Sequence, residues 1–348
     1  MIAIILAGGK GLRLWPESRK NHPKQLCKFV NNQSMLEHTI ERLHLAGSKR
    51  IAIITSDDLL PLVENLVYQS FGTDNIDIIS EPEGKNTAPA VGLALSLYYE
   101  QFPNEVIGVF PADHHVLDVN AFIASIDKAA QAAEKGHLTT IGISPNRPET
   151  GYGYIEKTRY EVGEIPDVYH VNSFYEKPDY RTAANYISTG NHMWNSGIYI
   201  SKTKTLLDEF KKYLPELYEK IILGHTSYLN SYPNFPSISL DYAIAEKSQN
   251  IAVVPADFGW CDLGSWNALE ELYPLDDSNN ICNGQDIVPI ESYNCVIKQA
   301  DKSIVTFGLD NLLVVETDDV IFVADRNRCQ DFRHIVEILE KQNRHDLI

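Results

Sequence analysis

The sequence predicts an α/β fold, a doubly wound and mostly parallel sheet followed by a small β domain. Over the first part of the chain, short β-branched apolar runs alternate with helix-like stretches, as in sheets that helices cover on both faces. After about residue 283 the apolar runs become shorter and are separated by polar or glycine turns. We therefore expect one large domain over residues 1–282 and a small β domain over 283–348 that ends in a helix.

Five apolar runs near the start of the chain predict buried parallel strands. They lie at residues 2–6, 51–55, 76–79, 106–110 and 138–143. Helix signals stand between them. Ser34 begins a capping box, Asn86 can cap a helix, and Asn120 begins an alanine-rich stretch that ends at Gly136.

The later part of the chain mixes both kinds of element. An insertion over 144–270 has extended runs at 152–157, 169–175 and 194–200 and helices near 179–189, 203–222 and 239–248. Short strands follow at 286–290, 293–298, 303–307, 311–315 and 320–324, and an amphipathic helix begins at Asp331.

A glycine-rich turn after the first strand predicts an anion site. The turn consists of Gly8, Gly9, Lys10 and Gly11. Without Cβ atoms, its backbone N–H groups can approach a phosphate chain, and Arg13 and Lys24 supply positive charge. Residues 1–28 hold six Lys or Arg and one acid, whereas the whole chain carries a net charge of −17. Such a basic segment in an acidic protein indicates one specific anion site rather than a nucleic-acid surface, although a structural tight turn is the simpler alternative.

Two other interpretations of the glycine loop are disfavoured. The dinucleotide fingerprint G-x-G-x-x-G is absent, which weakens the interpretation as a dinucleotide oxidoreductase. The Walker pattern is absent too, because Gly11 follows Lys10 where that pattern needs Ser or Thr.

Composition limits the location and class of the protein. No apolar run approaches the roughly 20 residues of a membrane span, and the first residues lack the features of a signal peptide. The five cysteines are odd in number and have no C-x-x-C spacing. This pattern argues against a disulfide framework or zinc site and predicts a cytoplasmic protein without membrane contact.

The motifs of the chain, taken together, resemble those of the sugar-nucleotide pyrophosphorylases. L-A-G-G-K-G-L-R-L-W-P and P-K-Q-L occupy residues 6–16 and 23–26. Further motifs resemble the mannose-1-phosphate guanylyltransferase branch and lie at 81–89, 111–114, 151–156, 174–178, 194–197 and 260–264. The resemblance implies transfer of GMP from GTP to α-D-mannose 1-phosphate, with Mg²⁺, and a left-handed β-helix near the C-terminus. Longer relatives carry a mannose-6-phosphate isomerase domain, which we do not expect here.

The resemblance and the chemistry of nucleotidyl transfer assign residues to roles. Arg13 and Lys24 are assigned to the triphosphate, and Asp113 and Asp262 to the metal. As alternatives, Asp262 would cap a helix beginning near Ser265, and Asp113 would be an ordinary turn residue.

The two substrates have separate expected subsites. The nucleotide subsite comprises Leu6, Ala7, Gly8, Gly9, Gly11, Glu81, Asn86, Thr87, Pro111 and Ala112. Glu81 is the candidate for the base, because a carboxylate can accept from both guanine donors; the alternative is an Asn cap beside a solvated Glu. The sugar-phosphate subsite comprises Gly153, Glu176, Lys177 and Asn195. Lys177 is assigned to the phosphate, and its alternative role is a surface lysine at a strand end.

Other functions stay open at this point. The chain could be a pyrophosphorylase for another sugar or base, of the thymidylyl or uridylyl type, or a non-catalytic sensor of nucleotide sugars. The region after residue 283 is expected to carry no catalytic group, with its acids on solvated turns. Its apolar strand faces must bury against the large domain or against a second subunit in a homodimer.

Overall fold

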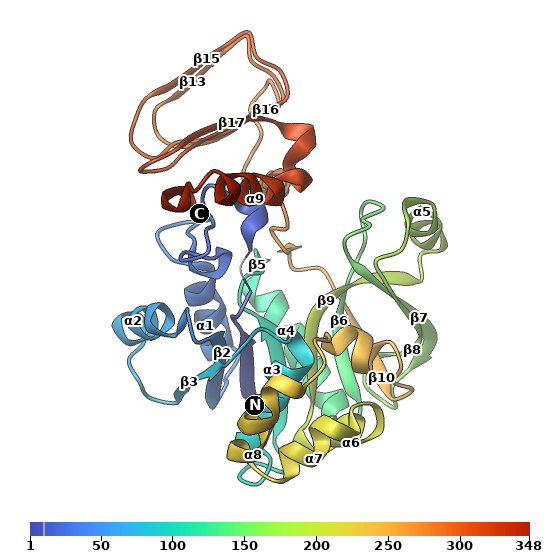
Figure 1. Cartoon of the computed structure of the whole chain (residues 1–348). Helices are drawn as coiled ribbons and strands as arrows, with labels where there is room; N and C mark the ends of the chain where they lie inside the picture. Colours follow the sequence, from blue (N-terminus) through green and yellow to red (C-terminus); the bar gives the residue numbers. More distant parts are fainter. Residues whose placement is uncertain (10) are drawn as a thin grey trace. The chain divides into compact units, whose positions relative to one another are not determined.

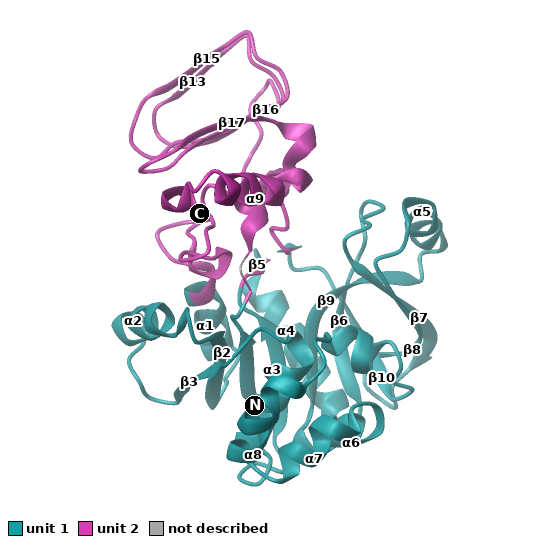
Figure 2. Ribbon diagram, viewed as in Figure 1, with its two compact units in different colours: residues 1–8, 37–112, 116–260 teal, residues 9–36, 113–115, 261–348 magenta. Residues whose placement is uncertain are grey.

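The structure, a computed structural model, describes residues 1–9 and 11–348 (Figure 1). It divides into two compact units (Figure 2). Unit 1 consists of Met1–Gly8, Glu37–Ala112 and Val116–Trp260, and unit 2 of Gly9–Leu36, Asp113–His115 and Cys261–Ile348. Unit 2 therefore contains the expected small domain together with the segment that follows the first strand. The domain boundary at 282/283 itself remains a prediction.

A nine-stranded sheet forms the centre of unit 1. Its strands are β1 (Ile2–Leu6), β2 (Arg50–Ser56), β3 (Ile76–Glu81), β4 (Val106–Pro111), β6 (Leu138–Ile143), β7 (Gly153–Glu161), β8 (Tyr169–Glu176), β9 (His192–Lys202) and β10 (Ile251–Ala256). Their order in space is β3-β2-β1-β4-β9-β6-β10-β8-β7. All run in one direction except β8 and β9, which are antiparallel to their neighbours. The predicted mostly parallel sheet is confirmed.

Helices cover both faces of this sheet. They are α1 (Met35–Leu45), α2 (Leu60–Ser70), α3 (Thr87–Tyr98), α4 (Val119–Glu134), α5 (Tyr180–Thr189), α6 (Thr203–Tyr213), α7 (Pro215–Ile222) and α8 (His225–Ser231). Val109 of β4 packs in one core cluster with α3, α6, α7 and α8. The next residue, Phe110, contacts Phe122 of α4. Because successive strand residues point to opposite faces, α3 and α4 lie on opposite faces, as a doubly wound sheet requires.

Three helix predictions in unit 1 differ from the structure, and the C-terminal helix of unit 2 begins at Arg333 rather than Asp331. The alanine-rich helix begins at Val119, since Asp118 rather than Asn120 accepts the capping bond from the Ala121 amide at 3.0 Å. The helix expected over 203–222 is interrupted, because the residue before Pro215 cannot keep helical geometry. The helix expected over 239–248 is one π-helical turn, Asp241–Ala245.

Short stacked strands form the C-terminal part of unit 2. They are β12 (Ile281–Asn283), β13 (Ile287–Ile290), β14 (Val296–Lys298), β15 (Ile304–Phe307), β16 (Leu312–Glu316) and β17 (Ile321–Asp325). They pair in parallel, apart from the antiparallel pair β16–β17. Figure 1 labels β13, β15, β16 and β17. Helix α9 (Arg333–Lys341) follows. The short strands β5 (His115–Val116) and β11 (Trp260–Cys261) lie where the chain passes from one unit to the other.

The segment after the first strand shares the core of unit 2 with this C-terminal part. Leu14, Phe29 and Met35 are buried in one cluster with Trp266 and Leu313. None of the helices in the described part of the chain combines the length and hydropathy that a membrane span needs.

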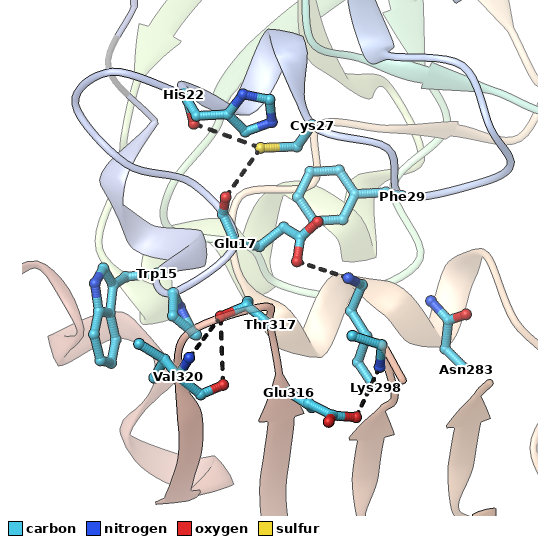
Figure 3. Close-up of polar contacts among 12 residues, drawn as sticks. Trp15, Glu17, His22, Cys27, Phe29, Asn283, Lys298, Glu316, Thr317 and Val320 are labelled. Atoms are coloured by element: carbon cyan, nitrogen blue, oxygen red, sulfur yellow. Dashed lines mark hydrogen bonds and ion pairs between the residues drawn. The ribbon is translucent and has the colours of Figure 1, made fainter. Parts of the chain in front are cut away.

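Ion pairs tie the same segment to the C-terminal part of unit 2. Lys298 Nζ lies 2.6 Å from the Glu17 carboxylate (Figure 3). Arg19 donates to Asp319 at 2.7 Å. Lys20 pairs with Glu340. The basic excess of residues 1–28 is therefore partly neutralised by acids far along the chain, which charge counting within the segment did not anticipate.

The acids after residue 283 are not all solvated. Glu316 is buried, and its carboxylate accepts the backbone N–H groups of Ala300, Asp301 and Lys302 at 3.0–3.2 Å. The expectation that these acids lie at exposed turns is wrong for Glu316, and Asp319 holds Arg19. The backbone N–H groups of the turn need the Glu316 carboxylate as their hydrogen-bond acceptor. The Arg19 guanidinium needs the Asp319 carboxylate in the same way.

Candidate active site

All four residues that the sequence assigned to catalysis line one cavity of unit 2. The cavity has a volume of about 540 Å³ and is bordered by Arg13, Lys24, Asp113 and Asp262, among others. Each comes from a different local element. Arg13 belongs to a 3₁₀ turn after the glycine loop, Lys24 begins a second 3₁₀ turn, and the two aspartates follow β4 and β11. Lys10 lies outside the described residues.

Lys24 lies at the centre of this group. Its side chain is buried, and Nζ donates to Asp113 Oδ2 at 2.8 Å and also to the Asp262 carbonyl. Gly11 makes this packing possible. It has a φ of 56°, and a Cβ there would come within 2.5 Å of Lys24 Cβ. One glycine of the loop is therefore required by the close approach of a lysine side chain.

The two aspartates differ in their surroundings. Burial pushes the pKa of Asp113 upward, but the charges of Lys24 and His114 outweigh it and leave the pKa below its ordinary value. Asp262 Oδ1 accepts from the Gly264 amide at 2.9 Å. The alternative of Asp262 as a helix cap is wrong, because Ser265 occupies the cap position of the following 3₁₀ turn.

Carboxylate chemistry in this cavity suits magnesium. Mg²⁺ is usually held by one or two carboxylates together with phosphate oxygens and waters. Asp113 and Asp262 both border the cavity, and no group of three or more His, Cys, Asp or Glu side chains suited to a metal occurs among residues 1–9 and 11–348. The donor set fits a metal that completes its shell with substrate oxygens.

In unit 1, Glu81 lies against the beginning of the glycine loop. It ends β3, it is buried, and Oε2 accepts from the Tyr232 hydroxyl at 2.7 Å. A Cβ on Gly8 would collide with Glu81 Oε1. Burial raises the pKa of Glu81, and the bond from Tyr232 opposes that shift. The fold thus brings Gly8 and Glu81 together, and their roles toward a nucleotide stay predictions.

The pairing of β1 with β2 and β4 brings together the other residues of unit 1 that flank the glycine loop. Leu6 of β1 is the register partner of Pro111 of β4, and the Ala112 amide donates to the Leu6 carbonyl at 3.2 Å. The Ala7 amide donates to Ile54 of β2 at 2.7 Å. These predicted nucleotide-binding residues therefore meet at the carboxyl ends of neighbouring strands.

Asn86 and Thr87 make contacts within unit 1 that already explain their residue types. Asn86 Oδ1 accepts from the Thr87 amide at 2.9 Å and caps α3, as predicted. Thr87 Oγ1 accepts from the Leu240 amide at 2.7 Å. Their roles toward a nucleotide stay predictions.

The sugar-phosphate candidates of unit 1 form a second polar group. Gly153 and Glu176 are register partners on β7 and β8. Lys177 pairs with the buried Glu176 carboxylate, while its own side chain is 54% exposed. Burial would lower the pKa of Lys177, but the bond to Glu176 raises it above the ordinary value. The lysine therefore stays charged and accessible.

Asn195 belongs to a network that sequence reasoning missed. Its Nδ2 donates to Asp241 at 2.8 Å, and the Tyr199 hydroxyl donates to the same oxygen at 2.6 Å. Asn195 Oδ1 accepts from Thr140 at 3.1 Å. Burial, followed by the charge of Asp241, raises the pKa of Tyr199 well above its usual value. A helical pattern gave no reason to single out Asp241, although π turns are frequent at functional sites.

The place of the C-terminal helix beside the cavity was also missed. Arg333, Val336, Glu337 and Glu340 of α9 line the cavity of unit 2. The amphipathic pattern predicted the helix. It carried no signal that the helix shares a cavity with Arg13 and Lys24, which lie about 300 residues earlier in the chain.

Comparisons with known proteins agree with the fold and the motifs. The nucleotidyl transferase family model matches residues 2–278, and the MannoseP isomerase/GMP-like beta-helix domain matches residues 285–339, which confirms the expected β-helix. A protein of Vibrio cholerae serotype O1 is 39% identical over 99% of this chain and 75% of its own length. The mannose-1-phosphate guanylyltransferase of Klebsiella pneumoniae is 36% identical over 99% of this chain and 75% of its own length.

A solved structure extends the likeness to three dimensions. It is described as mannose-1-phosphate geranyltransferase from Thermus thermophilus, is 33% identical, and covers 97% of this chain and 98% of its own with a TM-score of 0.87. On the family match and the likenesses over almost all of this chain, the chain belongs to the nucleotidyl transferase family, among the mannose-1-phosphate guanylyltransferases.

Proposed function

We propose that the protein transfers GMP from GTP to α-D-mannose 1-phosphate and forms GDP-mannose and pyrophosphate. The observation that carries the proposal is the single cavity bordered by Arg13, Lys24, Asp113 and Asp262. Cations and carboxylates that face one space are what an enzyme needs to align two anions and to stabilise the charge that develops between them.

The reaction needs no covalent protein intermediate. A phosphate oxygen of the sugar phosphate forms a bond to the α-phosphorus of GTP, and the bond between the α-phosphorus and the bridging oxygen breaks with release of pyrophosphate. Arg13 and Lys24 bind the triphosphate and the departing pyrophosphate. Lys177 holds the sugar phosphate, and Glu81 accepts from guanine.

Asp113 and Asp262 would hold Mg²⁺, which neutralises phosphate charge and polarises the reacting phosphoryl group when it is bound. Lys24 already lies on Asp113, so the carboxylate is kept ionised for that task. Asp262→Asn tests this role. The amide can still accept from Gly264, so the turn should persist while turnover at limiting Mg²⁺ falls. Asp318→Asn, on an exposed turn, is the control.

The test of the function is a direct assay. The purified protein is incubated with Mg²⁺, GTP and mannose 1-phosphate, and both pyrophosphate and GDP-mannose are measured. Pyrophosphate formed only with another nucleotide or another sugar phosphate would favour the other pyrophosphorylases. Binding of GDP-mannose without turnover would favour the nucleotide-sugar sensor.

Fewer observations support the proposed location and assembly of the protein. All five cysteines are free, which supports a cytoplasmic protein. Val305, Phe307, Ile321 and Val323 are exposed on the short strands of unit 2, which supports the homodimer. We expect neither nucleic acid nor membrane among its partners.

A further inference from the structure

We propose that Arg333 of the C-terminal helix α9 is an additional anion ligand, which binds the terminal phosphates of GTP and the pyrophosphate that leaves. The proposal rests on the proposed function and adds a residue from outside the nucleotidyl transferase match to its site. The β-helix region of the chain would then take part in catalysis directly.

The first argument is position. Arg333 borders the same cavity as Arg13 and Lys24. Its neighbours along the chain are fixed, because Phe332 is buried in the main core cluster of unit 2 and Val336 is buried against Trp15. Arg333 itself is exposed. Because the backbone is anchored, binding of a ligand has to order only the arginine side chain and not the helix that carries it.

The second argument is the pairing of charges around the cavity. Of its other lining cations, Lys20 pairs with Glu340 and Lys24 with Asp113. Glu337 lies one helical turn after Arg333, but its carboxylate contacts His334 Nδ1 at 3.4 Å. Among the residues that the structure describes, Arg13 and Arg333 are thus the lining cations without a carboxylate partner.

The third argument is that helix stability does not explain an arginine at this position. Arg333 is the first residue of α9, and the first turn of the helix contains no acid. A cation there opposes the helix dipole, which favours negative charge at this end. A guanidinium does, however, match phosphate oxygens with two parallel hydrogen bonds.

The experiment begins with inorganic pyrophosphate as the probe. Calorimetry measures its binding to the full-length protein with Mg²⁺, without GTP or sugar phosphate. We expect Arg333→Gln to weaken binding by about 10- to 100-fold, the range for a lost hydrogen bond to a charged group. Arg333→Lys should recover part of the loss. Arg328→Gln is the matched control, because Arg328 is exposed and pairs with Asp331.

Steady-state kinetics then separate binding of the phosphates from a general structural effect. In Arg333→Gln, the KM for GTP and, in the reverse reaction, for pyrophosphate should rise, while the KM for mannose 1-phosphate stays within about twofold. An equal rise for both substrates, with a lowered unfolding temperature, would overturn the proposal in favour of a structural role.

Two outcomes keep this inference and the proposed function apart. Unchanged pyrophosphate affinity in Arg333→Gln overturns the inference, whatever the wild-type protein synthesises. If the wild type makes no GDP-mannose but its pyrophosphate binding still depends on Arg333, the proposed function fails and the anion ligand stands.

Discussion

Lys24 donates a hydrogen bond to Asp113 at 2.8 Å, so a cation assigned to the triphosphate rests on a carboxylate assigned to the metal. The lysine side chain is 7% exposed and that of Asp113 33% exposed, so the pair is only partly shielded from water. With the roles proposed above, a metal ion on Asp113 would compete with Lys24 for the same carboxylate until a nucleotide gives the lysine another partner.

This competition predicts opposite effects of one substitution. Lys24→Met should raise the affinity for Mn²⁺ in the absence of nucleotide, because the competing charge is gone. It should also lower turnover by about 100-fold, the scale of one lost contact to the transition state. Calorimetry and a pyrophosphate assay measure the two quantities. Lys28→Met, an exposed change in the same segment, should alter neither. Reduced Mn²⁺ affinity in Lys24→Met would contradict the competition.

Glu81→Gln should erode the preference for GTP over ATP. A carboxylate accepts from both guanine donors, whereas an amide has one acceptor oxygen. The substitution keeps the shape of the side chain against Gly8 and can still accept from Tyr232. The ratio of kcat/KM values for GTP and ATP is the measurement. An unchanged ratio in a variant that still folds would remove Glu81 from the base subsite.

The same variant predicts a pH dependence of stability. Burial raises the pKa of Glu81 above its ordinary value of 4.5. Below that value Glu81 is protonated in both the folded and the unfolded state. As pH rises through the raised pKa, the wild type loses the stability that the buried neutral acid contributed, by about 1.4 kcal/mol for each pH unit between the folded and unfolded pKa values. As the pH rises from 4 to 8, the unfolding temperature of the wild type should therefore fall relative to that of Glu81→Gln. Parallel curves of unfolding temperature against pH for the two proteins would exclude a raised pKa.

Lys177→Ala should raise the KM for mannose 1-phosphate by about 10-fold or more, since a charge-assisted bond to phosphate is lost. The KM for GTP should stay nearly constant. Lys204→Ala, an exposed lysine of unit 1, controls for loss of surface charge. Equal effects on both substrates would indicate that Lys177 acts through the fold, for example by leaving the Glu176 carboxylate unpaired.

Glu316→Ala should destabilise unit 2, because three backbone N–H groups lose their acceptor at a buried position. Thermal unfolding should shift downward by several degrees. Asp318→Ala, two residues on and exposed, should leave the unfolding temperature unchanged. Equal unfolding temperatures for the two variants would show that water replaces the Glu316 carboxylate.

The sequence predicted those parts of the molecule that depend on local pattern. Apolar runs located eight of the nine strands of the sheet, and β10 was missed. Motifs assigned Leu6 and Pro111 to one subsite, and the register of β1 and β4 brings them side by side. Contacts between distant segments left no such pattern. The pairs Lys20–Glu340 and Arg19–Asp319 join residues 320 and 300 positions apart, so a count of local charge could not include them.

The same distinction applies to the candidate site. Arg13, Lys24, Asp113 and Asp262 stand in motifs, and the fold brings all four to one cavity. Arg333 and Asp241 stand in ordinary helical patterns. Their neighbours are determined by how whole elements pack, which no single stretch of sequence encodes.

The indole N–H of Trp15 donates at 2.8 Å to the carbonyl of Leu347, a residue 332 positions later in the chain. During synthesis, domains generally fold from the N-terminus onward. The sheet of unit 1 can complete itself once residue 256 has left the ribosome, but the segment that carries Arg13 and Lys24 must wait for the strands and the helix that enclose it. In a nascent chain the sheet can thus form well before the segment with Arg13 and Lys24 is held in place by the residues at the end of the chain.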